Sequence, residues 1–247
     1  MEIIILSLVF LLGVISGFFD SVLGAGGLIS IPGLIFAGLP AQIAIATDRF
    51  GTLGQTIPAL FKFWKAKKIV WKYVLLLTII SLMGSVIGAH ILLNINLQIL
   101  SKIMGILLLV LLPLIFLKPK VQHKHTAQNK FKIVAGLAIY LLIMIFSGFF
   151  GQGTGPLIFY ALTFFLGFTM LEVLGTGIIP WFVLSLSSVI IFAFNGIIDY
   201  WIGIILFIGM ALGSYIGAHV ALQKGDRWIK QLFILLVIVS SIKLLFF

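Results

Sequence analysis

The sequence lacks cysteine, which excludes disulfide bonds and thiol chemistry. Charged residues are also scarce: Asp, Glu, Lys and Arg make up 9% of its 247 residues, whereas soluble domains carry about 25%. Hydrophobic residues make up 62%. A chain of this length cannot hide so much apolar surface from water, and several stretches approach or exceed the roughly 20 apolar residues that span a bilayer. The composition therefore predicts an all-α polytopic membrane protein.

Acidic residues are the scarcer charge, with 6 against 16 basic residues and a formal net charge of +10. Ten basic residues gather in two short segments: Lys62, Lys65, Lys67, Lys68, Lys72, Lys118, Lys120, Lys124, Lys130 and Lys132. Such loops are typical of the cytoplasmic side of a membrane protein, and the clustering argues against a nucleic-acid partner. The first apolar stretch, residues 3–19, lacks a basic segment before it and a cleavage site after it, so we interpret it as a retained helix.

The apolar stretches form two series of five. The first series is 3–19, 28–38, 41–64, 70–93 and 97–117, and the second is 131–150, 157–167, 169–194, 200–222 and 228–247. The second stretch of each series has 11 residues, which rise about 16 Å as a helix and cannot cross an apolar core about 30 Å thick. The predicted organisation is a first transmembrane repeat at 1–117, a cytoplasmic linker at 118–130 and a second repeat at 131–247.

A glycine-rich break precedes each short stretch. The first break lies in residues 20–32 (DSVLGAGGLISIP) and the second in residues 147–156 (SGFFGQGTGP). Their glycines align 127 positions apart, Gly24 with Gly151 and Gly26 with Gly153. The two halves are therefore predicted to be repeats, each with one interrupted helix.

A second motif also recurs. Residues 84–90 (GSVIGAH) return 129 positions later as residues 213–219 (GSYIGAH), and an insertion of two residues accounts for the change of offset. Chance recurrence at matching places is very improbable. Small residues at this spacing also allow close helix packing in lipid, which is the simpler explanation for Gly88 and Gly217.

The lysine-rich loops predict the orientation. If they are cytoplasmic, the connections at residues 94–96 and 195–199 lie outside, and both termini are extracytoplasmic. Each half then crosses the membrane an odd number of times, which inverts the second half relative to the first. Inverted repeats with an interrupted helix in each half are typical of secondary transporters.

The breaks are candidate binding elements. Lipid cannot satisfy irregular backbone, so each break must face protein or a watery cavity. The short helices starting near Gly27 and Gly155 would point their N-termini, which favour anions, at that cavity. The predicted substrate-binding residues are Ser21, Gly24, Gly26, Gly27, Thr47, Arg49, Gln152, Gly153, Thr154 and Gly155. The alternative is that the glycines only permit tight helix packing.

Arg49 is the second candidate element. It lies nine residues past Pro40, about 13 Å into a helix. A charged guanidinium in a membrane is costly and marks function by default, and its planar fork suits an oxyanion such as a sulfonate or carboxylate. The alternative is a structural ion pair with Asp20 or Asp48. Asp48 is adjacent in sequence and therefore points about 100° away on a helix.

Asp20 directly precedes the first break. Three roles are open for Asp20: capping the turn, pairing with Arg49, or carrying a proton in coupled transport. Its counterpart 127 positions later is Ser147, so any proton role is confined to one half. Trp181 follows Pro180 in a long apolar stretch and is a candidate to line the pathway. The histidines near segment ends form no spacing that predicts a metal site.

The motifs in order resemble the sulfite exporter TauE/SafE family. They are DSxxGxGGLIxxP at residues 20–32, GLP at 38–40, ATDR at 46–49, GFFGQGTG at 148–155 and GA at 217–218. The resemblance covers nearly the whole chain. It implies a membrane permease for sulfur-containing anions such as sulfite, sulfoacetate and other organosulfonates, with exporters more common than importers.

Two departures from the family pattern affect the expected site. Ser147 stands where related members often have an acid, and the segment around Gly177 lacks the basic residue that often follows the second motif of this type. The site would then rely on one arginine, which leaves the substrate open.

The sequence thus predicts a transporter, and by preference an exporter, of a small sulfur-containing oxyanion, working by alternating access between the two breaks. An interior-negative potential favours anion exit by about 2.3 kcal/mol per charge per 100 mV, so export needs no coupling ion. A proton-coupled importer of an organosulfonate or carboxylate, with Asp20 as proton carrier, and an anion channel stay open as alternatives.

Other classes fit less well. An intramembrane enzyme needs a nucleophile and base or a metal cluster at depth, and a divalent-metal exporter needs clustered Cys, His or acids. The expected partners are a small anion and the lipid bilayer, with no cofactor and no metal. The expected location is the inner (plasma) membrane, as a multi-pass monomer or homodimer.

Overall fold

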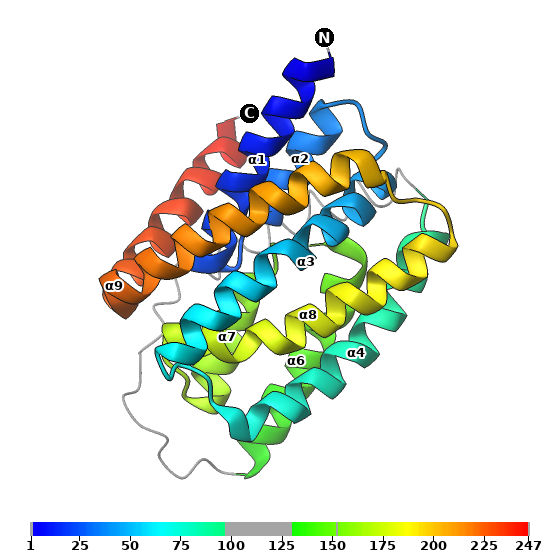
Figure 1. The fold of residues 1–247 in the computed structure, drawn as a ribbon. Helices are drawn as coiled ribbons and strands as arrows, with labels where there is room; N and C mark the ends of the chain where they lie inside the picture. Colours follow the sequence, from blue (N-terminus) through cyan, green and yellow to red (C-terminus); the bar gives the residue numbers. More distant parts are fainter. Residues whose placement is uncertain (1, 97–129, 152, 247) are drawn as a thin grey trace.

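The computed structural model describes residues 2–96, 130–151 and 153–246, and these ranges contain helices and no strand (Figure 1). The helices are α1 (Glu2–Leu23), α2 (Gly27–Phe36), α3 (Ala41–Lys65), α4 (Trp71–Asn94), α6 (Lys130–Phe150), α7 (Gly155–Leu166), α8 (Met170–Phe194) and α9 (Tyr200–Phe246). The predicted stretch 97–117 and the linker up to residue 129 lie outside the described residues. The prediction of an all-α protein is confirmed.

Among the described residues, five helices are long and apolar enough to cross a membrane, which confirms the polytopic prediction. These candidate spans are Ile5–Leu23, Trp71–Asn94, Lys130–Phe150, Met170–Phe194 and Tyr200–Ile229. α3 has 25 residues but carries Asp48 and Arg49 in its interior. α9 is interrupted at Gly225, whose φ is 76°, where the sequence predicts a loop. α2 and α7 have 10 and 12 residues and rise about 15 and 18 Å.

The first helix is longer than predicted. α1 continues to Leu23, so Asp20 and Ser21 are helical and the first break is confined to residues 24–26. The helix ends because Gly24 adopts a φ of +64°, which side-chain-bearing residues rarely adopt. The Gly24 N–H still bonds the Asp20 carbonyl at 2.7 Å. The polar residues before the glycine therefore do not break the helix; the glycine does.

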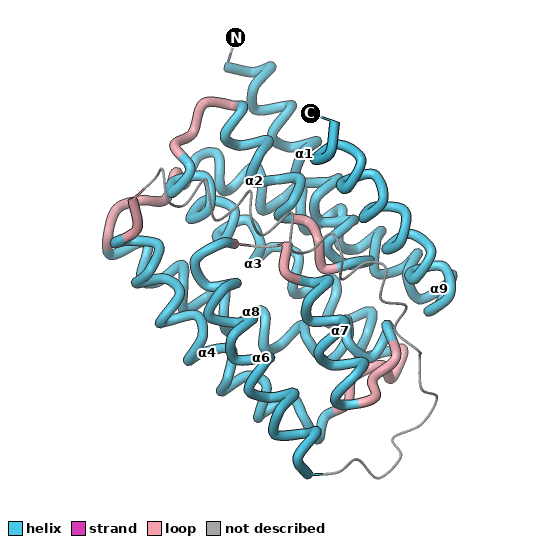
Figure 2. The backbone as a smooth tube through the Cα atoms, turned by 180° about the vertical axis from the view of Figure 1, so that it is seen from behind, coloured by secondary structure: helices cyan, strands magenta, loops and turns pink. Residues whose placement is uncertain are grey.

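The long helices pair across the two halves of the chain. α1 packs along α9, and α4 packs along α6. α3 also contacts α9, α4 also contacts α8, and α3 contacts α8 (Figure 1). The pairing of α1 with α9 therefore corresponds to that of α6 with α4, and the pairing of α3 with α9 corresponds to that of α8 with α4. Figure 2 shows the same helices from behind, joined by short loops within the described residues.

The recurring glycine motif lies at two of these pairings. A Cβ added to Gly88 of α4 would lie 2.3 Å from the carbonyl oxygen of Ile145 in α6. A Cβ added to Gly217 of α9 would lie 2.5 Å from the carbonyl oxygen of Phe18 in α1. Both distances are too short for any side chain, so these glycines allow close packing of helix backbones. Gly88 and Gly217 of the repeated motif therefore serve close helix packing, which is the simpler explanation given above for these two glycines.

Turn conformations also recur at the offset of 129. Gly38 and Gly167 end α2 and α7 with φ of 103° and 73°. Lys67 and Gly196 lie in the loops after α3 and α8 with φ of 55° and 66°. Lys67 is the only described residue other than glycine with a positive φ. It takes this unfavourable conformation at the position where the other half has glycine.

Two threonines 129 positions apart make the same contact. The Thr47 hydroxyl of α3 accepts the N–H of Asp199, just before α9. The Thr176 hydroxyl of α8 accepts the N–H of Val70, just before α4, and both distances are 3.0 Å. The two halves thus share turns, caps and pairings. Their inversion across a membrane remains a prediction.

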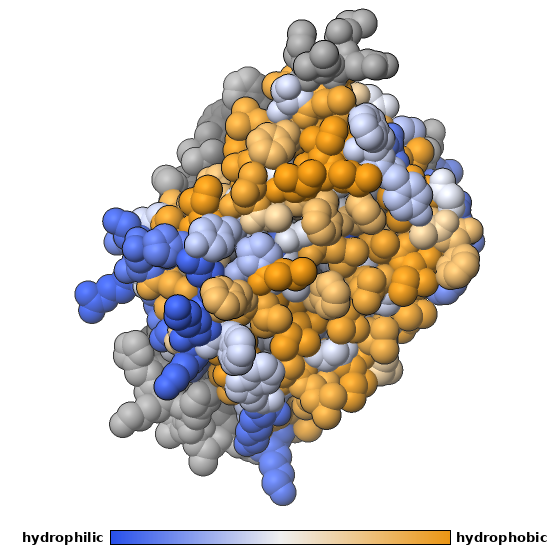
Figure 3. Space-filling model, viewed as in Figure 1, coloured by the Kyte–Doolittle hydropathy of each residue, from blue (hydrophilic) through white to orange (hydrophobic). Residues whose placement is uncertain are grey.

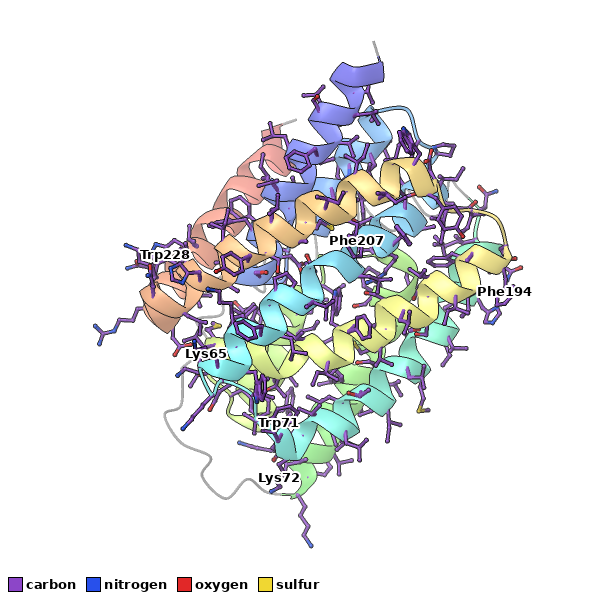
Figure 4. All side chains as sticks on the ribbon, viewed as in Figure 1. Lys65, Trp71, Lys72, Phe194, Phe207 and Trp228 are labelled. Atoms are coloured by element: carbon purple, nitrogen blue, oxygen red, sulfur yellow. The ribbon has the colours of Figure 1, made fainter. Side chains whose placement is uncertain are left out.

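The polar residues concentrate at one end of the molecule. We define the lysine end by Lys62, Lys65, Lys67, Lys68 and Lys72, in and beside the loop between α3 and α4. Figure 4 labels Lys65 and Lys72 there, with Phe194 at the far end of α8. Figure 3 shows hydrophilic residues gathered toward this end and a broad hydrophobic face beyond it. The chain termini lie away from the lysine end (Figure 1).

Candidate functional site

The two glycine breaks meet in the structure. The Gly155 N–H at the start of α7 donates to the Gly24 carbonyl at 3.0 Å. A Cβ on Gly155 would lie 2.2 Å from the Gly24 oxygen, and a Cβ on Gly24 would lie 2.8 Å from the Gly155 Cα. Neither position has room for a side chain. α2 begins at Gly27 and α7 at Gly155, as predicted.

The other residues of the second break have structural reasons for their identity. Gly151 and Gly153 have φ of 98° and 120°, a region that favours glycine. A Cβ on Gly153 would also lie 2.8 Å from the Leu28 side chain. The Thr154 hydroxyl shares a hydrogen bond of 2.5 Å with the Ser147 hydroxyl, so it is tied to the end of α6. Gln152, also predicted to bind substrate, lies outside the described residues.

A cavity of about 90 Å³ opens beside the junction of the breaks. Its walls are Asp20, Ser21, Gly24, Gln55, Thr56, Ala59, Phe63, Tyr140, Gly155, Ile158, Phe159, Val173, Leu174, Gly177, Ile178 and Trp181. A dry cavity of about 150 Å³ holds benzene, so this volume suits a small molecule. Asp20, Ser21 and Gln55 form a polar part of the wall, whereas much of the remaining wall is apolar and aromatic.

The cavity lies toward the lysine end. Its α3 residues begin at Gln55, in the last 11 residues of that helix. Its α8 residues come from the first half of α8, where a Cβ on Gly175 would lie 2.5 Å from the carbonyl oxygen of Lys68. Arg49 lies six residues back along α3 from Gln55, about 9 Å toward the opposite end.

Asp20 occupies the N-terminus of α2. One carboxylate oxygen accepts the Gly26 N–H at 3.0 Å, and the other accepts the Gln55 side-chain amide at 2.6 Å. Carboxylates are stabilised at helix N-termini by the free N–H groups and the dipole. The sequence leaves three roles open for Asp20, and the structure shows one of them: its carboxylate caps the turn before α2. The group nevertheless lines the cavity beside Ser21.

Arg49 is fully buried, and its guanidinium is held by backbone and hydroxyl oxygens. One terminal nitrogen donates to the Ser147 carbonyl and the other lies 3.5 Å from the Ser185 hydroxyl. Ser147 lies in the last turn of α6, where cations are favoured by the helix dipole. Within the described ranges, the Nε of Arg49 has no hydrogen-bond partner. The guanidinium also lies within electrostatic range of the carboxylates of Asp48 and Asp20.

Trp181 connects Arg49 with the cavity. The guanidinium carbon lies 5.1 Å from the centre of the Trp181 ring, within the range of a cation–π contact. Trp181 lines the cavity, as its position suggested, whereas Arg49 does not. Neighbouring Asp48 accepts the Ser30 hydroxyl at 2.5 Å. The arginine thus lies behind the aromatic wall in this conformation.

Of the predicted binding residues that the structure describes, Ser21, Gly24 and Gly155 line the cavity, whereas the others do not: Gly26, Gly27, Thr47, Arg49, Gly153 and Thr154. Thr47 caps the backbone before α9 and does not line the cavity. Conversely, Gln55 and Ser185 were not predicted as site residues. Gln55 is a long polar side chain in the interior of a long helix, and this is a signal that could have identified it. Ser185 has no such signal, because only the packing of α8 against α3 brings it to Arg49.

Other polar side chains have structural roles or lie at the surface. Glu172 and Thr169 form a reciprocal capping box at the start of α8. His90 and His219 are exposed. In the part of the chain that the structure describes, no three His, Asp or Glu residues are grouped as a metal ion would require.

Comparison with known proteins agrees with this architecture. The family model described as sulfite exporter TauE/SafE matches residues 9–244. A probable membrane transporter protein of Haemophilus influenzae is 25% identical over 242 residues, covering 98% of this chain and 95% of the relative. The probable membrane transporter protein YfcA of Escherichia coli is 26% identical over 245 residues, covering 98% and 90%.

A relative from Bacillus subtilis is also similar. The probable membrane transporter protein YdhB of Bacillus subtilis is 26% identical over 250 residues, covering 98% of this chain and all of the relative. No solved structure matches the chain. The matched family and relatives are membrane transporters and not enzymes, and the chain belongs to the sulfite exporter TauE/SafE family.

Proposed function

We propose that this transporter carries a small sulfur-containing oxyanion, such as sulfite or an organosulfonate, and that it works as an exporter. The observation that carries the proposal is the contact between the two breaks at the wall of a cavity. A short helix starts from each break, and helix N-termini attract anions. Ser21 at the cavity wall and neighbouring Thr154 would supply hydroxyl contacts.

The dimensions support a site near the middle of a membrane. The two short helices, of 10 and 12 residues, rise about 15 and 18 Å and meet at the junction. End to end they match an apolar core about 30 Å thick. We place the two halves as inverted repeats, each contributing one half-helix from its own side. Rocking of the halves about the junction would expose the site to each side in turn.

The proposed orientation has the lysine end in the cytoplasm and both termini outside, in the plasma membrane. Its support is the gathering of lysines at one end of the molecule and the position of the termini away from that end. The cavity lies toward the lysine end, so the structure would correspond to the inward-facing state. A cytoplasmic anion would then enter directly, and an interior-negative potential of 100 mV would favour its exit by about 2.3 kcal/mol per charge.

A flux assay in liposomes tests the proposal. The purified protein is reconstituted, and sulfite, organosulfonates and carboxylates are compared as substrates under an imposed potential. The expected result is saturable flux of sulfur oxyanions, driven by a negative potential on the substrate side. Arg49→Gln should abolish this flux, because it removes the guanidinium from the pathway. Lys224→Gln, an equal charge change on an exposed residue, is the matched control. Flux confined to carboxylates would overturn the substrate class, and flux rising linearly with voltage without saturation would indicate a channel.

Proton-coupled import of an organosulfonate or carboxylate is the second candidate. The observation that favours it is Asp20, whose carboxylate faces the cavity while it occupies the N-terminus of α2. An entering anion would meet a negative charge there unless Asp20 were protonated. In liposomes, an inward proton gradient should then accelerate uptake by the native protein and not by Asp20→Asn. Equal acceleration in both proteins would exclude Asp20 as the carrier.

A further inference from the structure

Trp181 stands between the cavity and Arg49. Its ring lines the cavity, and the Arg49 guanidinium lies against the ring at 5.1 Å. Arg49 is wholly inaccessible and is not part of the cavity wall. An anion in the cavity therefore meets the indole before it meets the cation. Trp181 is thus a side chain that contacts both the cavity and the buried cation.

The region behind Trp181 contains polar atoms without partners. In the described residues these include the Nε of Arg49, the indole nitrogen of Trp181 and the hydroxyl of Ser188, all buried. Buried polar groups are nearly always hydrogen-bonded, and leaving them unpaired is costly. Trp181, Ser185 and Ser188 lie four and three residues apart and so share one face of α8. This face turns toward Arg49, since Ser185 contacts it. The unpaired donors are the groups that an oxyanion would satisfy.

The helix is weakest next to Trp181. Pro180 lies inside α8 and has no N–H, so the carbonyl of Thr176 lacks its helical partner. Gly177 faces the cavity, and a Cβ added there would meet no atom within 4 Å. The turn before Trp181 therefore has both a missing hydrogen bond and free space beside it. Bends in helices arise at such positions, and a small bend would carry the indole off the guanidinium.

We infer that Trp181 is a gate between the cavity and a second anion position at Arg49, formed by the guanidinium, Ser185 and Ser188. This rests on the proposed function, because it assumes that an anion enters the cavity. When the anion moves past the displaced indole, charge-assisted hydrogen bonds to Arg49 replace the cation–π contact. The aromatic ring thus keeps the cation covered until an anion arrives.

Thiol labelling tests the gate without knowledge of the substrate. The chain has no cysteine, so Ser188→Cys provides a single thiol behind Trp181. The probe is an anionic methanethiosulfonate reagent bearing a sulfonate, added to the protein in detergent. Ser21→Cys, on the cavity side of Trp181, is the matched control. Each is combined with Trp181→Phe, which keeps a ring, and with Trp181→Ala, which removes it.

The gate predicts a specific pattern of rates. The labelling rate of Ser188→Cys should be low with Trp or Phe at position 181. With Ala at position 181 the rate should rise about tenfold or more. This is the increase expected when the open state, populated below about 10% in the native protein, becomes the main state. Labelling of Ser21→Cys should be fast in all three. Equal rates at Ser188→Cys with Trp and with Ala would overturn the gate. Monodispersity and melting temperature exclude unfolding of the Ala variant as the cause. Failure of the flux panel with this labelling pattern intact would count against the proposed substrate alone.

Discussion

Replacement of Gly155 by alanine should separate the two breaks. The added Cβ would lie 2.2 Å from the Gly24 oxygen and 2.5 Å from its Cα. The backbones must then move apart by about 1 Å to reach ordinary contact distances, and overpacking of this kind costs about 1–3 kcal/mol. Loss of the Gly155–Gly24 hydrogen bond costs about 1 kcal/mol more. The higher helix propensity of alanine offsets about 1 kcal/mol of this cost, so the net loss is about 1–3 kcal/mol.

Two measurements check this prediction. The melting temperature of the purified protein should fall by about 2–12 °C, since each kcal/mol corresponds to about 2–4 °C at this chain length. Anion flux in liposomes should be lost, because α7 no longer starts at the cavity wall. Gly177→Ala is the matched control for stability, as its Cβ would meet nothing within 4 Å. Unchanged melting and flux in Gly155→Ala would refute the reasoning that the junction is tight and functional.

Three further substitutions test other contacts. Gln55→Leu removes the donor at 2.6 Å from Asp20 and should lower stability by about 1–3 kcal/mol, seen as a lower melting temperature; an unchanged value would mean that water replaces the amide. Thr176→Val removes the acceptor of the Val70 N–H and should cost about 1 kcal/mol, with equal melting of mutant and native protein as the contrary result. Gly217→Val forces α9 from α1 and should prevent recovery of monodisperse protein, whereas normal recovery would contradict the close packing.

The helices were predictable because hydropathy and turn residues mark them directly. The sequence predicts a stretch at 131–150, and α6 runs from Lys130 to Phe150. The short helices are predicted because Gly and Pro interrupt otherwise apolar runs. The end of α1 was placed too early, because Asp20 and Ser21 read as a polar break although their backbone is helical. Local polarity does not distinguish a buried helix face from a turn.

The contact between the breaks followed from the repeat, but the partners of Arg49 did not. A doubled motif implies that equivalent elements meet near a shared axis, which the Gly155–Gly24 bond satisfies. The Arg49 guanidinium instead bonds a backbone carbonyl of α6 and a hydroxyl of α8. Any residue has a carbonyl, so no side-chain pattern identifies this partner. Only the crossing of three helices determines it.

The two halves share a scaffold and divide the chemistry unequally. Asp20 corresponds to Ser147 at the offset of 127, and Arg49 corresponds to Ile178 at the offset of 129. The positive end of α2 is consequently neutralised by the carboxylate of its own half, whereas the first turn of α7 contains no acid. A bound anion is therefore expected nearer to α7 than to α2, off the axis that relates the halves. Symmetric packing would let both halves move alike, while the asymmetric charges would decide where the anion binds during that movement.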